Sequence, residues 1–329
     1  MFERRTFIKA LAAISATAAA PMTRLVHAQS TYPARPVSII SPFPPGGSAD
    51  SMARALAEQL SKRMGQSFYI ENRPGAGGAI GAGAAAKAAP DGYTIVIGAA
   101  GAMAINVSLY KNLSYDPVND FVPITLIGYS PVLLVASTGQ TANTVNELIE
   151  AAKTAPGQLS FASNGNGTAH HLTAELFMQT ADIDMVHVPY KGTALAVQDV
   201  VAGRVPYGFL DLTLCLPLIK SGKLKGIATS GLKRSAAAPD IPTVAESGLP
   251  GFDAVGWFGL FGPRGMQQDA IDAINKNVEE VLSTSKFQET ALSLAVDPKW
   301  STPQALADYQ TQEIEKWANV IRIAGVTIE

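Results

Sequence analysis

One segment near the start of the chain constrains the fold more than any other, residues 38–50 (SIISPFPPGGSAD). The apolar run just before it, Val37–Ile40, predicts a buried strand, and the prolines that follow end the strand because proline has no backbone donor. Gly46 and Gly47 then permit a turn through conformations that other residues avoid. Ser48 is suited to cap a helix over residues 49–64, where apolar residues recur every four positions.

A strand, a glycine turn and a helix N-terminus in this order form a place where an anion can bind. The first turn of a helix leaves several backbone N–H groups unpaired, and the positive end of the helix dipole lies behind them. A loop of the same composition can also do nothing more than reverse the chain. The rest of the sequence has to decide between these interpretations.

Residues 1–28 predict an export signal. Arg4 and Arg5 begin a basic region, an alanine-rich apolar stretch follows, and Val26-His27-Ala28 offers a small-residue cleavage site. The paired arginines favour the twin-arginine route, with an ordinary secretory signal as the alternative. We expect no membrane anchor, since no later stretch approaches the roughly 20 apolar residues that span a bilayer.

Charge and cysteine content exclude several classes of function. Residues 1–28 carry four basic side chains and one acidic one, so their removal changes the net charge from −2 to −5. A chain of this charge is not expected to bind nucleic acid or an anionic membrane. Cys215 is the only cysteine, so no intrachain disulfide can form, and we expect it to be a small buried residue.

Strands and helices alternate along the chain, which predicts an α/β fold with parallel sheets covered by helices on both faces. The apolar run Phe121–Ser137 is too long for one strand of a compact sheet. We interpret it as a strand that leaves one lobe and enters the next, with Leu224–Thr229 as the return. The predicted lobes are therefore 29–131 with 229–329 (lobe 1, discontinuous) and 132–228 (lobe 2).

Ligands bind open parallel sheets at the carboxyl ends of the strands. Here those ends carry the loops 42–48, 99–103, 163–168 and 190–193, and Asp211. Two lobes joined twice would bring these loops together across one cleft. A nucleotide is not expected, because the second glycine loop has Ile80 where the third glycine of a dinucleotide motif belongs.

At this point the residues resemble a known family, the Bug receptors. These are periplasmic solute-binding proteins of tripartite tricarboxylate transporters. The similarity runs in order through nearly the whole mature chain, in segments 35–50, 71–78, 90–94, 120–121, 163–170, 188–192, 222–224, 239–243 and 246–252.

The resemblance implies a two-lobed periplasmic-binding-protein fold of the type II Venus flytrap kind, with the ligand cleft between the lobes. It implies a small carboxylate ligand held by backbone amides, hydroxyls and water, without an arginine clamp. It also implies membrane permease subunits as partners, a periplasmic location and a receptor that is not an enzyme. We further expect a monomer without cofactor or metal.

The predicted ligand-binding residues come from these loops. They are Phe43, Gly46, Gly47, Ser48, Asp50, Ala100, Met103, Ser163, Asn164, Gly165, Thr168, His170, Tyr190, Lys191, Gly192 and Asp211. Ser163 and Asn164 could instead cap their own turn, and His170 is expected to support the loop more than to touch the ligand. Asp211 could accept from the ligand or from the neighbouring loop at Tyr190 and Lys191. His171 and His187 are expected to be structural.

One loop departs from the family pattern. Residues 99–103 read Ala-Ala-Gly-Ala-Met, where the family carries a hydroxyl side chain. Phe43 and Met103 would then leave one wall of the site apolar. The sequence therefore predicts a carboxylate less polar than citrate, with an aliphatic or aromatic body.

Rival interpretations are weaker. A hydrolase could use Ser163, His170 and Asp211, but the strained G-x-S-x-G elbow is absent. A metal site at His170 and His171 is disfavoured because adjacent helical residues point to different faces. A binding protein that presents its ligand to a membrane sensor instead of a transporter remains open.

Overall fold

The computed structural model describes residues 32–328. The predicted export signal, residues 1–28, lies outside the described residues. Within the described residues, no helix is both long enough and apolar enough to cross a membrane.

Ten strands form the sheet of the described part of the chain. They are β1 (Val37–Ser41), β2 (Phe68–Asn72), β3 (Thr94–Ala99), β4 (Phe121–Ser137), β5 (Ser160–Ser163), β6 (Val186–Pro189), β7 (Tyr207–Asp211), β8 (Leu224–Thr229), β9 (Val255–Pro263) and β10 (Asp297–Pro298).

The helices that follow or cover these strands are α2 (Ser48–Met64), α3 (Ala79–Ala86), α4 (Asn106–Leu109), α5 (Val145–Thr154), α6 (Ala169–Ala181), α7 (Thr193–Val201), α8 (Leu212–Lys220), α9 (Gln268–Leu282), α10 (Ser285–Ser293) and α11 (Pro303–Ala324). Two short turns are helical as well, a 3-10 turn at Ala76–Gly78 and a π-helical turn at Gly101–Ile105.

The strand order is β2-β1-β3-β9-β4-β7-β5-β6, with β8 and β10 also paired to β4. Strands β1, β2 and β3 are parallel to one another, and so are β5, β6 and β7, as the alternating sequence predicts. The sheet as a whole is mixed, because β9 runs antiparallel to β3 and β4 while β4 runs antiparallel to β7, β8 and β10. The predicted α/β fold therefore holds, with antiparallel strands where the chain crosses the sheet.

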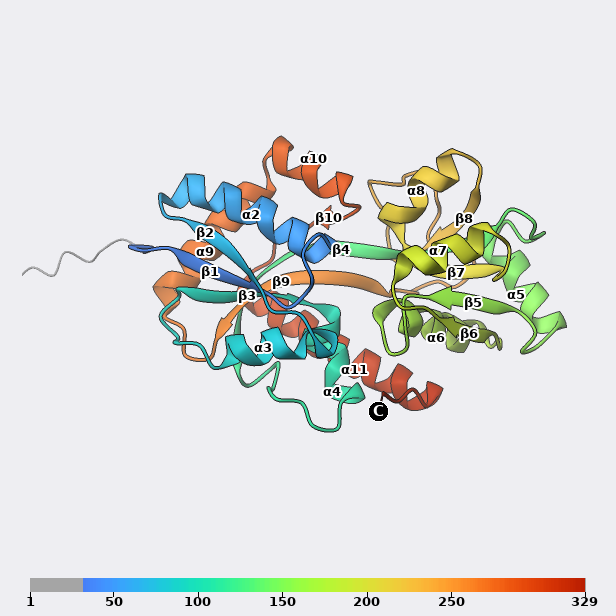
Figure 1. Cartoon of the computed structure of the whole chain (residues 1–329), viewed down its shortest axis with the longest axis horizontal. Helices are drawn as coiled ribbons and strands as arrows, with labels where there is room; N and C mark the ends of the chain where they lie inside the picture. Colours follow the sequence, from blue (N-terminus) through green and yellow to red (C-terminus); the bar gives the residue numbers. More distant parts are fainter. Residues whose placement is uncertain (1–31, 329) are drawn as a thin grey trace, which may run out of the picture. The chain divides into compact units, whose positions relative to one another are not determined.

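Strand β4 has the bounds that the apolar run Phe121–Ser137 predicts and links two groups of strands. It pairs with β9 as far as Pro131, and from Val132 onward it pairs with β7. In Figure 1, β4 (green) runs from the group containing β1, β3 and β9 to the group containing β5, β7 and β8. The bounds of the two lobes stay a prediction.

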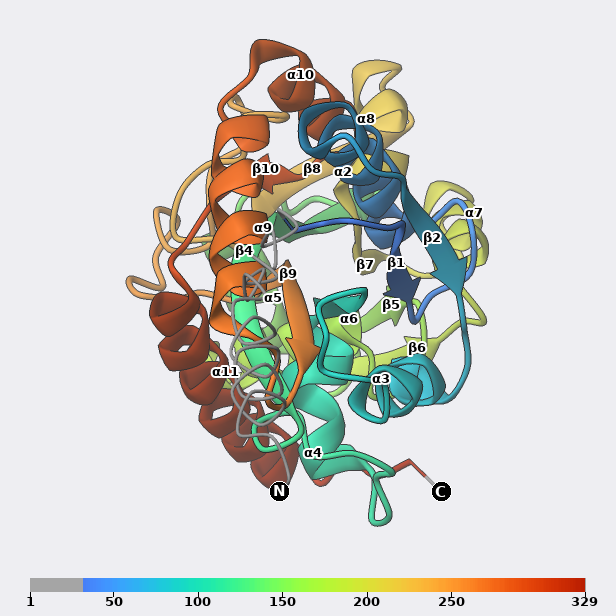
Figure 2. The ribbon, with the colours of Figure 1, turned by 90° about the vertical axis from the view of Figure 1, so that its left-hand side faces the viewer.

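Alternation along the strands sends side chains to opposite faces of the sheet. Val37 and Ile39 of β1 belong to one buried cluster with α2, α9 and α10, whereas Ile40 belongs to another with α3, the π-helical turn and α11. Figure 2 shows α9 and α11 along β4, which both helices contact. These helices fix the ends of the strands, from which the loops of the candidate site extend.

Several helix starts behave as the sequence predicts. Thr144 accepts a hydrogen bond from the Glu147 amide at the start of α5, and Thr302 accepts one from the Ala305 amide at the start of α11. The predicted cap of α2 is wrong, however. Ser48 is the first helical residue, and the N-cap position is occupied by Gly47 in an extended conformation (φ −74°, ψ 165°) without a side-chain cap bond.

Candidate functional site

A cavity of about 1020 Å³ opens among the carboxyl ends of the strands. Its lining comes from the β1–α2 and β2–α3 loops, the start of α2, the end of β3, α4, the middle of β4, the first residues of β9, the β5–α6 loop, the end of β7 and Ile328. The helices α2 and α6 both place their N-termini at this cavity, through Gly47, Ser48 and Ala49 on one side and Gly167, Thr168 and Ala169 on the other.

The β1–α2 loop is held in place by Asp50, which is buried. Its carboxylate accepts from the Gly46 amide at 3.0 Å, from Arg54 Nε at 2.9 Å and from Asn72 Nδ2 at 2.6 Å. Asn72 Nδ2 also donates to the Phe43 carbonyl at 3.1 Å, so the loop is tied to β2. Burial alone would raise the pKa of Asp50, but these hydrogen bonds and the nearby guanidinium hold it below its ordinary value.

The β5–α6 loop is also held by its own side chains. Thr168 is the N-cap of α6, and its hydroxyl accepts from the His171 amide and donates to the Gly165 carbonyl at 2.8 Å. Gly165 has φ +137°, a conformation that favours glycine, and its amide donates to Ser163 Oγ at 3.2 Å. Ser163 therefore closes the turn, which is one of the two roles that its sequence position suggests.

Asp211 and His170 are hydrogen-bonded to each other at the cavity. His170 Nε2 lies 3.1 Å from Asp211 Oδ1, and Thr193 donates its hydroxyl to Asp211 Oδ2. Burial would raise the pKa of Asp211, yet the charge of His170 and the two hydrogen bonds lower it to about 2. Asp211 thus accepts from Thr193, the first residue of α7, and not from Tyr190 or Lys191 in the loop before it.

Two polar atoms at the cavity lack a partner within the described residues. They are Asn164 Oδ1 and His170 Nδ1, and both are buried. Because His170 Nε2 donates to a carboxylate, Nδ1 is the nitrogen left for another contact. Buried polar atoms are normally hydrogen-bonded, so these two atoms are available to a ligand or to ordered water.

His171 and His187 have structural roles, as expected. Their rings stack at 3.8 Å between centroids, and His187 also stacks on Phe161. Burial and the neighbouring His171 lower the pKa of His187 to about 3, so it is neutral at pH 7. Ser163 Oγ lies 2.7 Å from His187 Nε2 and not beside His170, so the serine, histidine and aspartate of the rival hydrolase hypothesis do not form a triad.

Half of the predicted ligand-binding residues line the cavity. These are Phe43, Gly47, Ser48, Ala100, Asn164, Thr168, His170 and Asp211. The other half lie outside its lining: Gly46, Asp50, Met103, Ser163, Gly165, Tyr190, Lys191 and Gly192.

The second group has identifiable other roles. Met103 is fully buried in the core, because its side chain packs where Gly98 leaves room. The Tyr190 hydroxyl donates to Asp199 at 2.6 Å, which keeps the ring on α7. The amides of Gly46 and Gly165 donate the hydrogen bonds that hold the turns described above.

Several lining residues were missed from the sequence. They are chiefly Asn106, Leu109 and Tyr110 near α4, Trp257 and Phe258 of β9, and Ile328. No motif marks them. The three aromatic residues within 257–261 are visible in the sequence and could have drawn attention to β9.

The cavity holds few charges. Among its lining residues, all within the described part of the chain, there is no lysine or arginine, and Asp211 is the one carboxylate. No group of three or more histidine, cysteine or acidic residues within 32–328 could hold a metal ion. Any anion bound here would therefore depend on amides, hydroxyls and His170.

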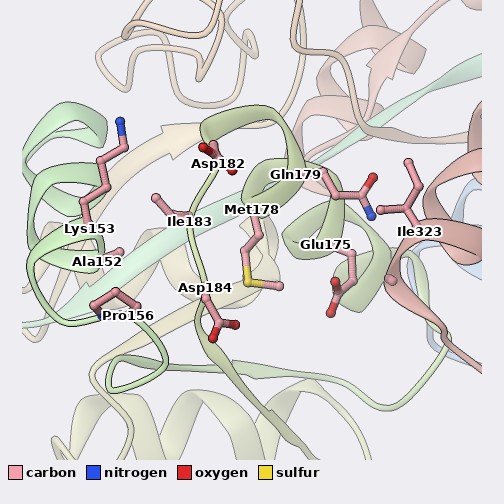
Figure 3. Close-up of a pocket in the computed structure, with 11 residues that line it drawn as sticks. Ala152, Lys153, Pro156, Glu175, Met178, Gln179, Asp182, Ile183, Asp184 and Ile323 are labelled. Atoms are coloured by element: carbon pink, nitrogen blue, oxygen red, sulfur yellow. The ribbon is translucent and has the colours of Figure 1, made fainter.

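A second cavity, of about 680 Å³, lies between α5, α6 and the end of α11. Figure 3 shows its lining, in which Glu175, Asp182 and Asp184 are acidic and Lys153 is the basic residue. None of the strand-end loops contributes to it, and its excess of carboxylates disfavours an anionic ligand.

The sequence model of the family described as "Tripartite tricarboxylate transporter family receptor" matches residues 52–326. The chain belongs to this family. Among curated relatives, Protein BugT of Bordetella pertussis (strain Tohama I / ATCC BAA-589 / NCTC 13251) is 37% identical over 300 residues, which is 91% of this chain and 92% of BugT. The predicted Bug-type receptor is thus confirmed.

Solved structures agree with this assignment. R. palustris Rpa4515 with adipate is 33% identical, with a TM-score of 0.79 over 90% of this chain and 100% of Rpa4515. The periplasmic binding protein BugD is 36% identical, with a TM-score of 0.74 over 90% of this chain and 100% of BugD. The chain has the fold of these solute-binding receptors, as its sequence predicts.

Proposed function

We propose that this receptor binds a small carboxylate in the 1020 Å³ cavity, with the N-termini of α2 and α6 as its two anion-binding points. The observation that carries the proposal is the convergence of two long helices on one cavity whose lining has no lysine or arginine. Each first turn offers unpaired N–H groups and the positive end of a helix dipole. A relative bound to adipate supports the same class of ligand.

The body of the ligand is expected to be apolar. Phe43, Leu109, Trp257 and Phe258 line the cavity between the two helix ends, and Ala99 and Ala100 contribute no hydroxyl. A ligand with an aliphatic or aromatic body would bury apolar surface against these side chains, at about 25 cal/mol per Å². We therefore retain the expectation of a carboxylate less polar than citrate, although Met103 takes no part in the wall.

The polar contacts are assigned by position. Ser48 and Gly47 would bind one carboxylate through their amides, and Thr168 with Asn164 would bind the other end. His170 would contribute Nδ1, because its Nε2 is held by Asp211. Asp50 and Ser163 would shape the two loops without touching the ligand.

The wider role follows from family and sequence. We propose that residues 1–28 direct export, through the twin-arginine route, and that the mature monomer works in the periplasm. The lobes would be 29–131 with 229–329 and 132–228, closing on the ligand by bending where β4 changes partner at Pro131 and Val132. The closed form would deliver the ligand to membrane permease subunits of the transporter.

A binding screen tests the proposal. The mature chain, unfolded in guanidinium and refolded to remove any copurified ligand, would be titrated calorimetrically with succinate, malate, adipate, citrate and benzoate. We expect binding of at least one carboxylate, with dicarboxylates of apolar body ahead of citrate. At about 100 times its Kd such a ligand adds roughly 2.7 kcal/mol to the free energy of unfolding. Refolded protein of native stability that binds none of them would refute the proposal.

A further inference from the structure

The residues that follow α11 return to the candidate site. Gly325 ends the helix in the left-handed conformation (φ +63°), which turns the chain away from the helix axis. Two residues further, the Thr327 carbonyl accepts from Asn166 Nδ2 at 3.0 Å. In Figure 1 the end of α11 (red) lies beside α6, and the bond from Gln179 Nε2 to the Val320 carbonyl, at 3.1 Å, joins the two helices.

Ile328 lies at the cavity through this path. It is half-buried, packs against the main core cluster and lines the cavity together with Leu109 of α4. Both side chains lie next to Gly167. A Cβ added to that glycine would lie 3.0 Å from Leu109 Cδ1 and 3.5 Å from Ile328 Cγ2. Gly167 has φ +69°, so it is suited to this position by conformation as well as by size.

The position of this apolar pair matters for a ligand. Gly167 directly precedes Thr168, the N-cap of α6, where one carboxylate is proposed to bind. A ligand held there has its next carbon atoms beside Ile328 and Leu109. Leu109 is part of α4 and is buried in the core, whereas Ile328 follows α11 and is only partly buried.

We propose that Ile328 is a specificity-determining residue of this receptor. Together with Leu109 it forms an apolar wall that favours carboxylates with a methylene chain next to the group bound at α6, over those with a hydroxyl or a further carboxylate there. This inference rests on the proposed function, and it specifies Ile328 as a residue that selects among carboxylate ligands.

Two aspartate variants test the position of Ile328. Ile328→Asp places a negative charge in the wall, whereas Ile323→Asp places the same charge in the last turn of α11, at the second cavity, where Ile323 is 55% exposed. Figure 3 shows Ile323 beside Gln179 in the second cavity, and Ile323 is not among the residues that line the first. We expect Ile328→Asp to raise the Kd for adipate about tenfold or more at low salt and less at high salt, with Ile323→Asp unchanged.

Ile328→Ala tests the selectivity itself. Loss of the side chain should weaken adipate binding roughly five- to tenfold and leave malate, whose hydroxyl gains nothing from the wall, within about twofold. Thermal unfolding without ligand checks that each variant keeps the stability of the parent chain. Equal Kd values for Ile328→Asp and Ile323→Asp, or equal losses for adipate and malate in Ile328→Ala, would overturn this inference alone. A parent chain that binds no carboxylate would refute the proposed function and this inference with it.

Discussion

Replacing Ser48 with proline removes one backbone N–H from the N-terminus of α2 while the helix can stay in place. Ser48 is the first helical residue, a position where proline is favoured because its fixed φ suits the helix. The preceding residue, Gly47, has φ −74° and ψ 165°, which is the extended conformation that a residue before proline requires. The substitution therefore tests the amide and not the fold.

The size of the effect follows from the kind of bond that is lost. A hydrogen bond to a charged group contributes about 1.5–3 kcal/mol. Its loss corresponds to an increase in Kd of roughly 10- to 150-fold. The hydroxyl of Ser48 is removed at the same time, so Ser48→Ala is the matched control, and it should change Kd much less than Ser48→Pro does.

Isothermal titration with the best-bound carboxylate of the screen would measure both variants against the parent chain. Unfolding midpoints without ligand should agree to within a few degrees among the three proteins. If Ser48→Pro and Ser48→Ala bind with the same Kd, the α2 amide does not hold the carboxylate, and the assignment of this helix end as an anion site is refuted.

Two further predictions concern stability, and a third concerns the loop before α2. Folding lowers the pKa of His187 to about 3, so between about pH 6.5 and 3 the unfolded chain binds one more proton than the folded chain does. The contribution of His187 to the free energy of unfolding is therefore complete above this range and decreases as the pH falls through it. The variant His187→Phe should show a smaller decrease in denaturant titrations. Gly98→Ala should destabilise the chain by about 1–3 kcal/mol, since its Cβ would lie 2.5 Å from Met103 Cγ, whereas Gly139→Ala, with no atom within 4 Å, should be nearly neutral. Asp50→Asn should loosen the loop and raise the Kd for ligand more than it lowers the melting temperature.

Each of these has a result that would contradict it. A parent chain and a His187→Phe variant with parallel pH profiles would show that the ring is protonated in the folded state. Equal stabilities of Gly98→Ala and Gly139→Ala would mean that the core shifts freely around Met103. An Asp50→Asn variant with unchanged Kd would show that the loop keeps its shape without the carboxylate.

Much of the fold could be predicted because its signals are local. The apolar run 121–137 gave both bounds of β4, and the capping residues Thr144 and Thr302 marked the starts of α5 and α11. The antiparallel strands were missed because direction within a sheet depends on where the chain returns, which periodicity does not report. Ser48 was misplaced by one position because Gly47 can itself adopt the extended cap conformation.

For the candidate site, too, some residues could be predicted from the sequence and others could not. Residues at the carboxyl ends of strands, such as Ser48, Thr168 and Asp211, were found because topology alone brings them to one edge. Trp257 lies near the start of β9 and Ile328 far along the sequence, so only the folded chain brings them to the cavity. Asp50, another predicted contact, lies outside the cavity lining, and its carboxylate is paired with Arg54.

A crystal structure of the mature chain with its best-bound dicarboxylate would test the central claim most directly. We predict one carboxylate within hydrogen-bond distance of the Gly47 and Ser48 amides at α2 and the other beside Thr168 at α6, with the carbon chain against the apolar wall. A ligand found in the second cavity beside Lys153, or bound in the first cavity with both carboxylates away from the two helix ends, would contradict it.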